Sequence, residues 1–133
     1  MNTNKYLIAS IAAGTWIFFY GFIVNTVLLK DFWSANVSPG LMRPEGQEVM
    51  WAIVASVYLQ GFVLSYIFTR GHENRGIGEG FRFGLLIAVF VAALYLLFYA
   101  IQPWGMTSTL VTMVVDSVMY IGAGVILAAI YKT

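Results

Sequence analysis

The stretch Arg82–Ile101 reads RFGLLIAVFVAALYLLFYAI and carries one charge, on its first residue. About 20 apolar residues in an α-helix are enough to cross the roughly 30 Å hydrocarbon core of a bilayer. Three further runs of this kind cover residues 6–29, 49–69 and 107–131. Because a helix satisfies its own backbone hydrogen bonds in lipid, these runs predict an all-α integral membrane four-helix bundle. We expect a single domain, residues 1–133.

The composition supports this prediction and excludes several classes of protein. Hydrophobic residues make up 60% of the chain and charged residues 10%, whereas soluble domains carry about 25% charged residues. The formal net charge is +1 without a basic cluster, which argues against a nucleic-acid partner. The chain has no cysteine, and its one histidine, His72, lies in a polar loop. We therefore expect no metal site, no cofactor and no enzymatic activity.

Basic residues near the ends of the spans predict the orientation of the helices. Five of them fall on one side if the spans alternate in direction: Lys5, Arg70, Arg75, Arg82 and Lys132. Only Lys30 and Arg43 fall on the other side. The side richer in Lys and Arg is usually cytoplasmic, so both termini are predicted to be cytoplasmic, in what we expect is a bacterial inner membrane. Residues 30–48 would form an outer loop of turns, with Trp33 and Trp104 at the outer headgroup level.

Small residues predict where the helices meet. Burial from water cannot drive helices together in lipid, but close backbone approach at Gly and Ala can. Such residues recur at four-residue spacing in the third and fourth spans: Gly80, Gly84, Ala88, Ala92, Gly124 and Ala128. This pattern is typical either of packing within one chain or of a contact between subunits.

A weak internal repeat indicates how the four spans could be organised. An offset of 61 residues places Ser56 over Ser117 and Gly61 over Gly122. Parallel repeats of this type relate two halves of a membrane protein by an axis along the membrane normal. We therefore expect two tandem helical hairpins.

Asp116 is the one acidic residue inside the predicted spans. A charged Asp near the bilayer centre costs about 2.5–3.5 kcal/mol on insertion scales and usually faces the bundle interior. No basic residue lies at its depth, so desolvation favours the uncharged carboxyl, and we expect it to be hydrogen-bonded inside the bundle. Polar residues at similar depths could line a cavity with it that opens outward: Tyr20, Asn25, Tyr58, Gln60, Tyr95, Tyr99 and Tyr120.

Two interpretations of these polar residues stay open. They suit a buried hydrogen-bond network that fixes helix register, and they equally suit a path for a solute or for protons. From the short loops and the small-residue faces, we expect a non-catalytic structural or accessory subunit, in a homo-oligomer or with other membrane subunits. The alternative is a proton-linked transporter or channel for a small solute that uses Asp116.

The segment Glu79-Gly80-Phe81-Arg82-Phe83-Gly84-Leu85-Leu86-Ile87, with the later Ile130-Tyr131-Lys132, carries a family resemblance. It resembles small four-helix bacterial membrane proteins of unknown function that have this glycine pattern at the start of the third helix. The resemblance covers the second half of the chain better than the first. It implies a four-helix membrane fold and brings no activity or ligand with it.

Overall fold

The structure is a computed structural model of the chain, and it describes residues 3–36, 46–71, 73–103 and 105–131. These ranges hold six helical elements and no strand: α1 (Thr3–Phe22), the π-helical turn η1 (Ile23–Leu28), α2 (Lys30–Asn36), α3 (Met50–Gly71), α4 (Ile77–Ile101) and α5 (Met106–Tyr131). With η1 continuing α1, four helices are long and apolar enough to cross a membrane. The prediction of an all-α four-helix membrane bundle is confirmed.

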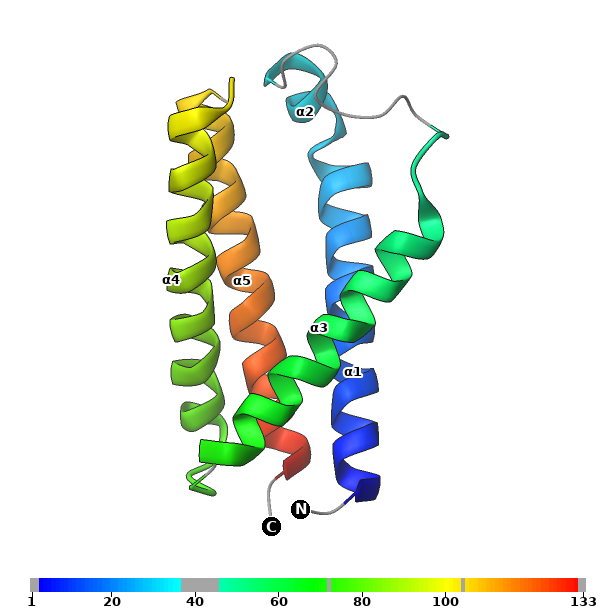
Figure 1. Ribbon diagram of the computed structural model, residues 1–133, viewed down its shortest axis with the longest axis vertical. Helices are drawn as coiled ribbons and strands as arrows, with labels where there is room; N and C mark the ends of the chain where they lie inside the picture. The colour runs from blue at the N-terminus through cyan, green and yellow to red at the C-terminus, as the bar shows by residue number, and fades with distance from the viewer. Residues whose placement is uncertain (1–2, 37–45, 72, 104, 132–133) are drawn as a thin grey trace.

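The helices pair as two hairpins. α1 packs along α3, α4 packs along α5, and α5 also contacts α1. Thr3 and Tyr131 lie at the same end of the bundle, which we call the terminal end, and α2 lies at the opposite or distal end (Figure 1). The two-hairpin arrangement agrees with the expected one.

The 61-residue offset does not match this packing. Gly61 faces the backbone of α1, its own hairpin partner, whereas the space at Gly122 is filled by Trp16 from the other hairpin. The α5 glycine that meets its own hairpin partner is Gly124, two residues further on. Residues aligned by the offset therefore have different neighbours.

α4 and α5 meet backbone to backbone at three glycines. A Cβ atom added to Gly124 would fall on the carbonyl oxygen of Gly80, and one added to Gly84 would lie 2.5 Å from the carbonyl oxygen of Tyr120. Ala88 and Ala128 are buried beside these contacts, while Ala92 is half-buried. The predicted small-residue stripe is thus used for packing within the chain.

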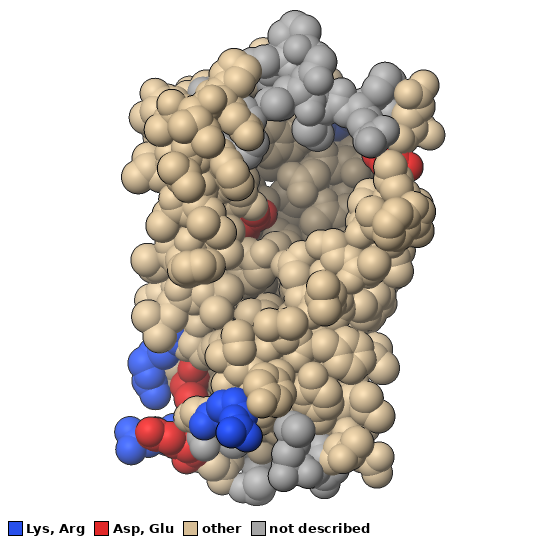
Figure 2. Space-filling model, in the orientation of Figure 1, with Lys and Arg blue, Asp and Glu red and all other residues tan. Residues whose placement is uncertain are grey.

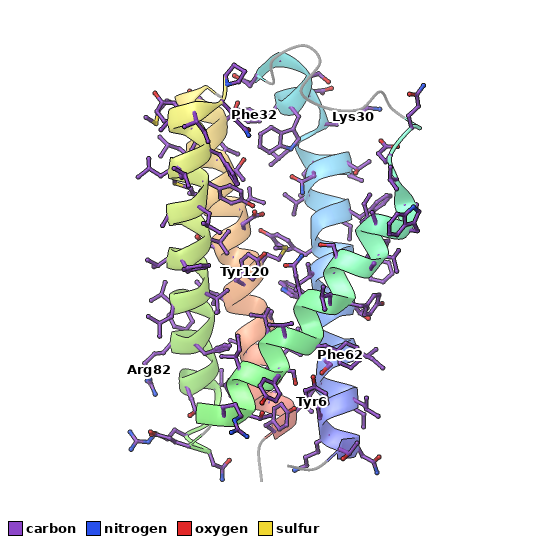
Figure 3. All side chains as sticks on the ribbon, viewed as in Figure 1. Tyr6, Lys30, Phe32, Phe62, Arg82 and Tyr120 are labelled. Carbon is purple, nitrogen blue, oxygen red and sulfur yellow. The ribbon has the colours of Figure 1, made fainter. Side chains whose placement is uncertain are left out.

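α1 and α3 meet through the same kind of contact. A Cβ atom on Gly61 would overlap the carbonyl oxygen of Ser10 and lie 2.8 Å from the backbone nitrogen of Gly14. Nearer the terminal end, the Tyr6 hydroxyl donates a 3.0 Å hydrogen bond to the carbonyl oxygen of Phe62, and the two rings meet edge to face (Figure 3). Each hairpin therefore has its own closely packed helix crossing.

Buried aromatic residues close the bundle at the terminal end. Phe68 of α3, 4% exposed, stacks on Phe83 of α4 with the ring centroids 5.3 Å apart. It also contacts Tyr131 of α5, whose hydroxyl shares a 2.8 Å hydrogen bond with Ser65. These residues bring α3, α4 and α5 together at this end.

At the distal end, α3 leans away from α4 and α5. Its first turns are largely exposed, with Trp51 at 77%, and Figure 1 shows the helix running obliquely across the bundle. Figure 2 shows the result, a hollow in the distal half between the two hairpins. α2 is tied to α5 near this end by a 2.8 Å hydrogen bond from the Ser108 hydroxyl to the carbonyl oxygen of Asn36.

Two segments differ from the expectations. α4 begins at Ile77 rather than at Arg82, directly after Gly76, whose φ of 80° suits a glycine. The contact of Gly80 with Gly124 stabilises this first turn, although glycine is a poor helix former. The second difference is α2, which forms in a segment where only turns were expected.

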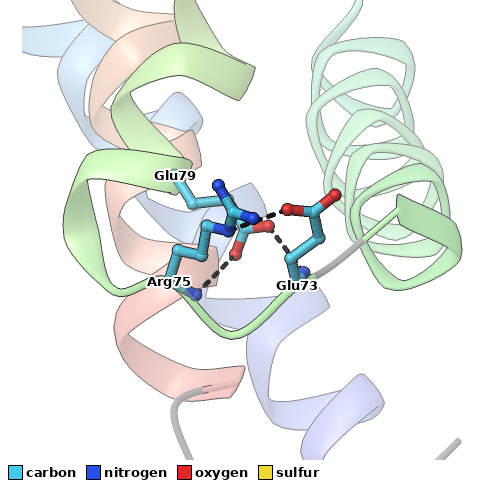
Figure 4. Close-up of polar contacts among 3 residues, drawn as sticks. All are labelled: Glu73, Arg75 and Glu79. Carbon is cyan, nitrogen blue, oxygen red and sulfur yellow. Dashed lines mark hydrogen bonds and ion pairs between the residues drawn. The ribbon is translucent and has the colours of Figure 1, made fainter.

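A network of charged groups orders the turn between the hairpins. The Glu79 carboxylate accepts hydrogen bonds from the backbone N–H groups of Glu73 (2.6 Å) and Arg75 (3.4 Å). Arg75 also pairs with the Glu73 carboxylate at 2.9 Å (Figure 4). Figure 2 shows that basic and acidic side chains gather at this terminal end. Of the other residues used to predict orientation, Arg43, Trp104 and Lys132 lie outside the described ranges, as does His72.

Candidate polar site between the hairpins

Asp116 lies on α5, facing α4 in the distal half of the bundle. Its Oδ2 atom accepts a short hydrogen bond from the Tyr95 hydroxyl of α4. Both side chains are half-buried. The expectation that Asp116 is hydrogen-bonded inside the bundle is therefore confirmed, while its protonation state stays a prediction.

The second carboxyl oxygen of Asp116, Oδ1, makes no hydrogen bond with a described residue. Among the described residues, Ser10 Oγ is the one buried side-chain polar atom without a hydrogen-bond partner. Oδ1 does not belong to that fully buried class, so this unbonded oxygen keeps some exposed surface area. This agrees with Figure 2, in which acidic atoms are visible in the hollow.

A second hydrogen-bonded chain connects α5 to α3. The Tyr120 hydroxyl donates to Oε1 of Gln60 at 2.7 Å, and Nε2 of Gln60 donates to the Ser56 hydroxyl at 3.1 Å. Tyr120 extends from α5 toward α1 and α3 (Figure 3). Because Tyr120 is one helical turn from Asp116, the two polar groups share one face of α5.

Two aromatic residues of α1 bind the backbone on either side of Asp116. Tyr20 donates to the carbonyl oxygen of Val115, and the Trp16 indole N–H donates to that of Met119, each at 2.7 Å. A carbonyl oxygen has two lone pairs, so it can accept these bonds in addition to the helical ones. The bonds fix α1 against α5 and keep the hydroxyl and indole groups paired at membrane depth.

The structure brings together five of the eight predicted polar residues: Tyr20, Gln60, Tyr95, Asp116 and Tyr120. The other three have different surroundings. Tyr58 shares a 2.9 Å hydrogen bond with Thr15 between α1 and α3, and the exposed Asn25 in η1 accepts a 3.1 Å bond from the Trp33 indole. Tyr99 makes no hydrogen bond with another described residue.

Trp16 was not predicted as part of this site. Its ring occupies the space at Gly122, where an added Cβ would lie 2.5 Å from the indole atom Cζ2. A signal for it exists in the sequence, because tryptophans of membrane proteins favour the interfaces, and Trp16 lies well inside a span. A buried indole N–H also requires an acceptor.

Trp16→Phe should lower the free energy of unfolding by about 1 kcal/mol, because hydrogen bonds between membrane helices contribute roughly 0.6 to 1.7 kcal/mol. Unfolding in mixed detergent micelles, followed by far-UV circular dichroism, measures the change. Trp33→Phe is the matched control, since the Trp33 bond to Asn25 joins two exposed groups. Equal stabilities of the two variants would contradict the role of Trp16 in holding α1 against α5.

The site contains one acidic group, and no basic residue takes part in its described hydrogen bonds. The described residues contain no group of three or more His, Cys, Asp or Glu side chains that could hold a metal ion. The hydrogen bonds of this site link α1, α3 and α4 to α5. The arrangement thus places one carboxyl group, with one oxygen unbonded, near the side chains of Tyr95, Tyr20 and Trp16.

Comparisons of the chain with protein families, curated proteins and solved structures gave no match. The resemblance of the Glu79–Ile87 segment to small four-helix bacterial membrane proteins therefore stays a prediction.

Proposed function

We propose that this chain is a non-enzymatic integral membrane protein that carries protons, linked to a small solute, through the hollow at Asp116. The proposal includes the predicted orientation, with the termini cytoplasmic and the hollow in the outer half of a bacterial inner membrane. The observation that supports it is the accessible Oδ1 atom of Asp116. A carboxyl oxygen open to a hollow at membrane depth can exchange a proton or bind a solute.

A purely structural role explains this oxygen less well. Ionisable groups inside a membrane are costly, and they are retained where they are paired or serve a pathway. Asp116 has one partner, Tyr95, on one of its two oxygens. A hydrogen-bond network that served only to fix helix register would gain from satisfying both oxygens.

The accessory-subunit role expected from the sequence is a second proposal. α4 supports it, because only Gly80, Gly84 and Ala88 of this helix are buried, and they all lie on one face. The outward face of α4, which includes the exposed Leu86, Val89 and Phe90, is available to lipid or to another subunit. The small-residue stripe supports this proposal less than expected, because it packs against α5 of the same chain.

Asp116→Asn tests the first proposal in liposomes that contain a pH-sensitive dye. Native protein should dissipate an imposed pH gradient, and the variant should do so at least tenfold more slowly, because an amide does not exchange a proton at neutral pH. Asp31→Asn is the matched control, since Asp31 is an exposed acid of α2 outside the site. Equal rates for native protein and Asp116→Asn, or a native rate no faster than that of empty liposomes, would leave the subunit role as the better proposal.

A further inference from the structure

The hydrogen-bond donors of the site are almost all in use. The hydroxyl groups of Tyr20, Tyr95 and Tyr120 each donate to an oxygen atom, and so does the indole N–H of Trp16. A phenol has one hydrogen to donate, and an indole also has one. Except for one amide hydrogen of Gln60 and the hydroxyl hydrogen of Ser56, whose oxygen accepts from Gln60, the site therefore has only acceptors left for a ligand.

The charge of the site also favours a positively charged ligand. Among the described residues its one ionisable acid is Asp116, whose Oδ1 atom is unbonded and partly exposed, and Figure 2 shows acidic atoms within the hollow. Lys30, the described basic residue at the distal end, lies on α2 outside the hydrogen-bonded cluster (Figure 3). Among the described residues the site thus has free acceptors, one acid and no base, so in its ionised form it would repel an anion and attract a cation.

An organic cation suits the site better than a metal ion does. The carbonyl oxygens of Val115 and Met119 already accept side-chain hydrogen bonds, and one carboxylate oxygen provides too few ligands for a hard metal ion. Aromatic rings attract organic cations through their faces. Trp16 and Tyr20 offer two neighbouring rings, with centroids 5.2 Å apart.

The opening of the hollow indicates the shape of the ligand. The hollow opens on the side of the bundle, between α4 and the distal part of α3 (Figure 2), so its mouth faces the acyl chains when the four helices span a bilayer. The stacked rings of Phe68 and Phe83 close the gap between these helices at the terminal end. A ligand with an apolar body can enter from the lipid and place a single charge against Asp116.

We propose that the hollow between the hairpins binds a lipophilic organic cation, with its charge on Oδ1 of Asp116 and its apolar body among the rings of Trp16, Tyr20 and Tyr120. This inference rests on the proposed function, because it names the class of solute for the same site. A proton and such a cation would compete for one carboxylate. Binding of the cation would therefore release the proton.

Tetraphenylphosphonium is the probe that tests the inference. Equilibrium dialysis of the radiolabelled cation against protein in zwitterionic lipid nanodiscs should give saturable binding at one site per chain. Asp116→Asn should weaken this binding at least tenfold, and Asp31→Asn should change it less than twofold. Circular dichroism and gel filtration of both variants confirm that they are folded.

Tetraphenylborate provides a test that needs no variant, because it has the same shape and the opposite charge. It should fail to compete with tetraphenylphosphonium on the native protein. Competition by the anion, non-saturable binding, or unchanged affinity in Asp116→Asn would overturn the cation site. If proton flux depends on Asp116 but the cation does not bind, only the ligand class is wrong. If both are absent, the proposed function is wrong as well.

Discussion

Gly124→Ala is expected to lower the free energy of unfolding by about 2–3 kcal/mol. The new methyl group would overlap the carbonyl oxygen of Gly80 and lie 2.9 Å from the backbone nitrogen of Gly84. Both are backbone atoms of α4, so no side-chain rotation can relieve the overlap, and overpacking of this kind costs about 1–3 kcal/mol or more. The measurement is unfolding in mixed detergent micelles, followed by circular dichroism.

Gly78→Ala is the control for this prediction. A Cβ atom at Gly78 would meet only the end of the Arg82 side chain, at 3.7 Å. Alanine is a better helix former than glycine by about 1 kcal/mol, so Gly78→Ala should be neutral or stabilising. If Gly124→Ala were as stable as Gly78→Ala, the backbone contact between α4 and α5 would be contradicted.

Phe68→Ala should cost about 2 kcal/mol, because it removes the ring that stacks on Phe83 and contacts Tyr131. In water, truncation of a buried Phe costs about 3–5 kcal/mol. In lipid, the part due to transfer from water is small, since unfolded side chains remain among acyl chains. The cost that remains is the loss of contacts around the cavity.

Phe90→Ala provides the comparison for Phe68→Ala, again by unfolding in mixed micelles. Phe90 is 64% exposed on α4, so its ring contacts lipid before and after the helices separate. Its truncation should change stability by less than about 0.5 kcal/mol, as for other substitutions away from packed contacts. Equal losses in the two variants would mean that the terminal end is not closed by the Phe68 and Phe83 stack.

The sequence predicts the number and length of the spanning helices well, for a simple physical reason. Lipid requires about 20 apolar residues with internally satisfied backbone groups, and the four runs meet this requirement one by one. The start of α4 was missed because Ile77 to Phe81 is rich in glycine and becomes helical through contact with α5. The local sequence alone does not reveal this contact between two helices.

The site was predicted in part, because residue number gives depth along a spanning helix but not the direction of a side chain around it. Tyr95 and Asp116 were expected near the same depth, and they do form a hydrogen bond. Tyr58 was expected with them, but it points to Thr15 between α1 and α3. The tilt of α3 opens the hollow. This tilt depends on the contact of Gly61 with α1 and on the packing of Phe68 against Phe83 at the terminal end.

The pairing of the hairpins has a consequence for biosynthesis. Gly61 meets α1 within residues 3–71, and Gly124 meets α4 within residues 77–131. Since chains begin to fold from the N-terminal side while they are being synthesised, the first hairpin can acquire its crossing before the second leaves the ribosome. The last event of assembly is then the docking of α5 on α1 through Trp16 and Tyr20. This step also forms the hollow between the hairpins.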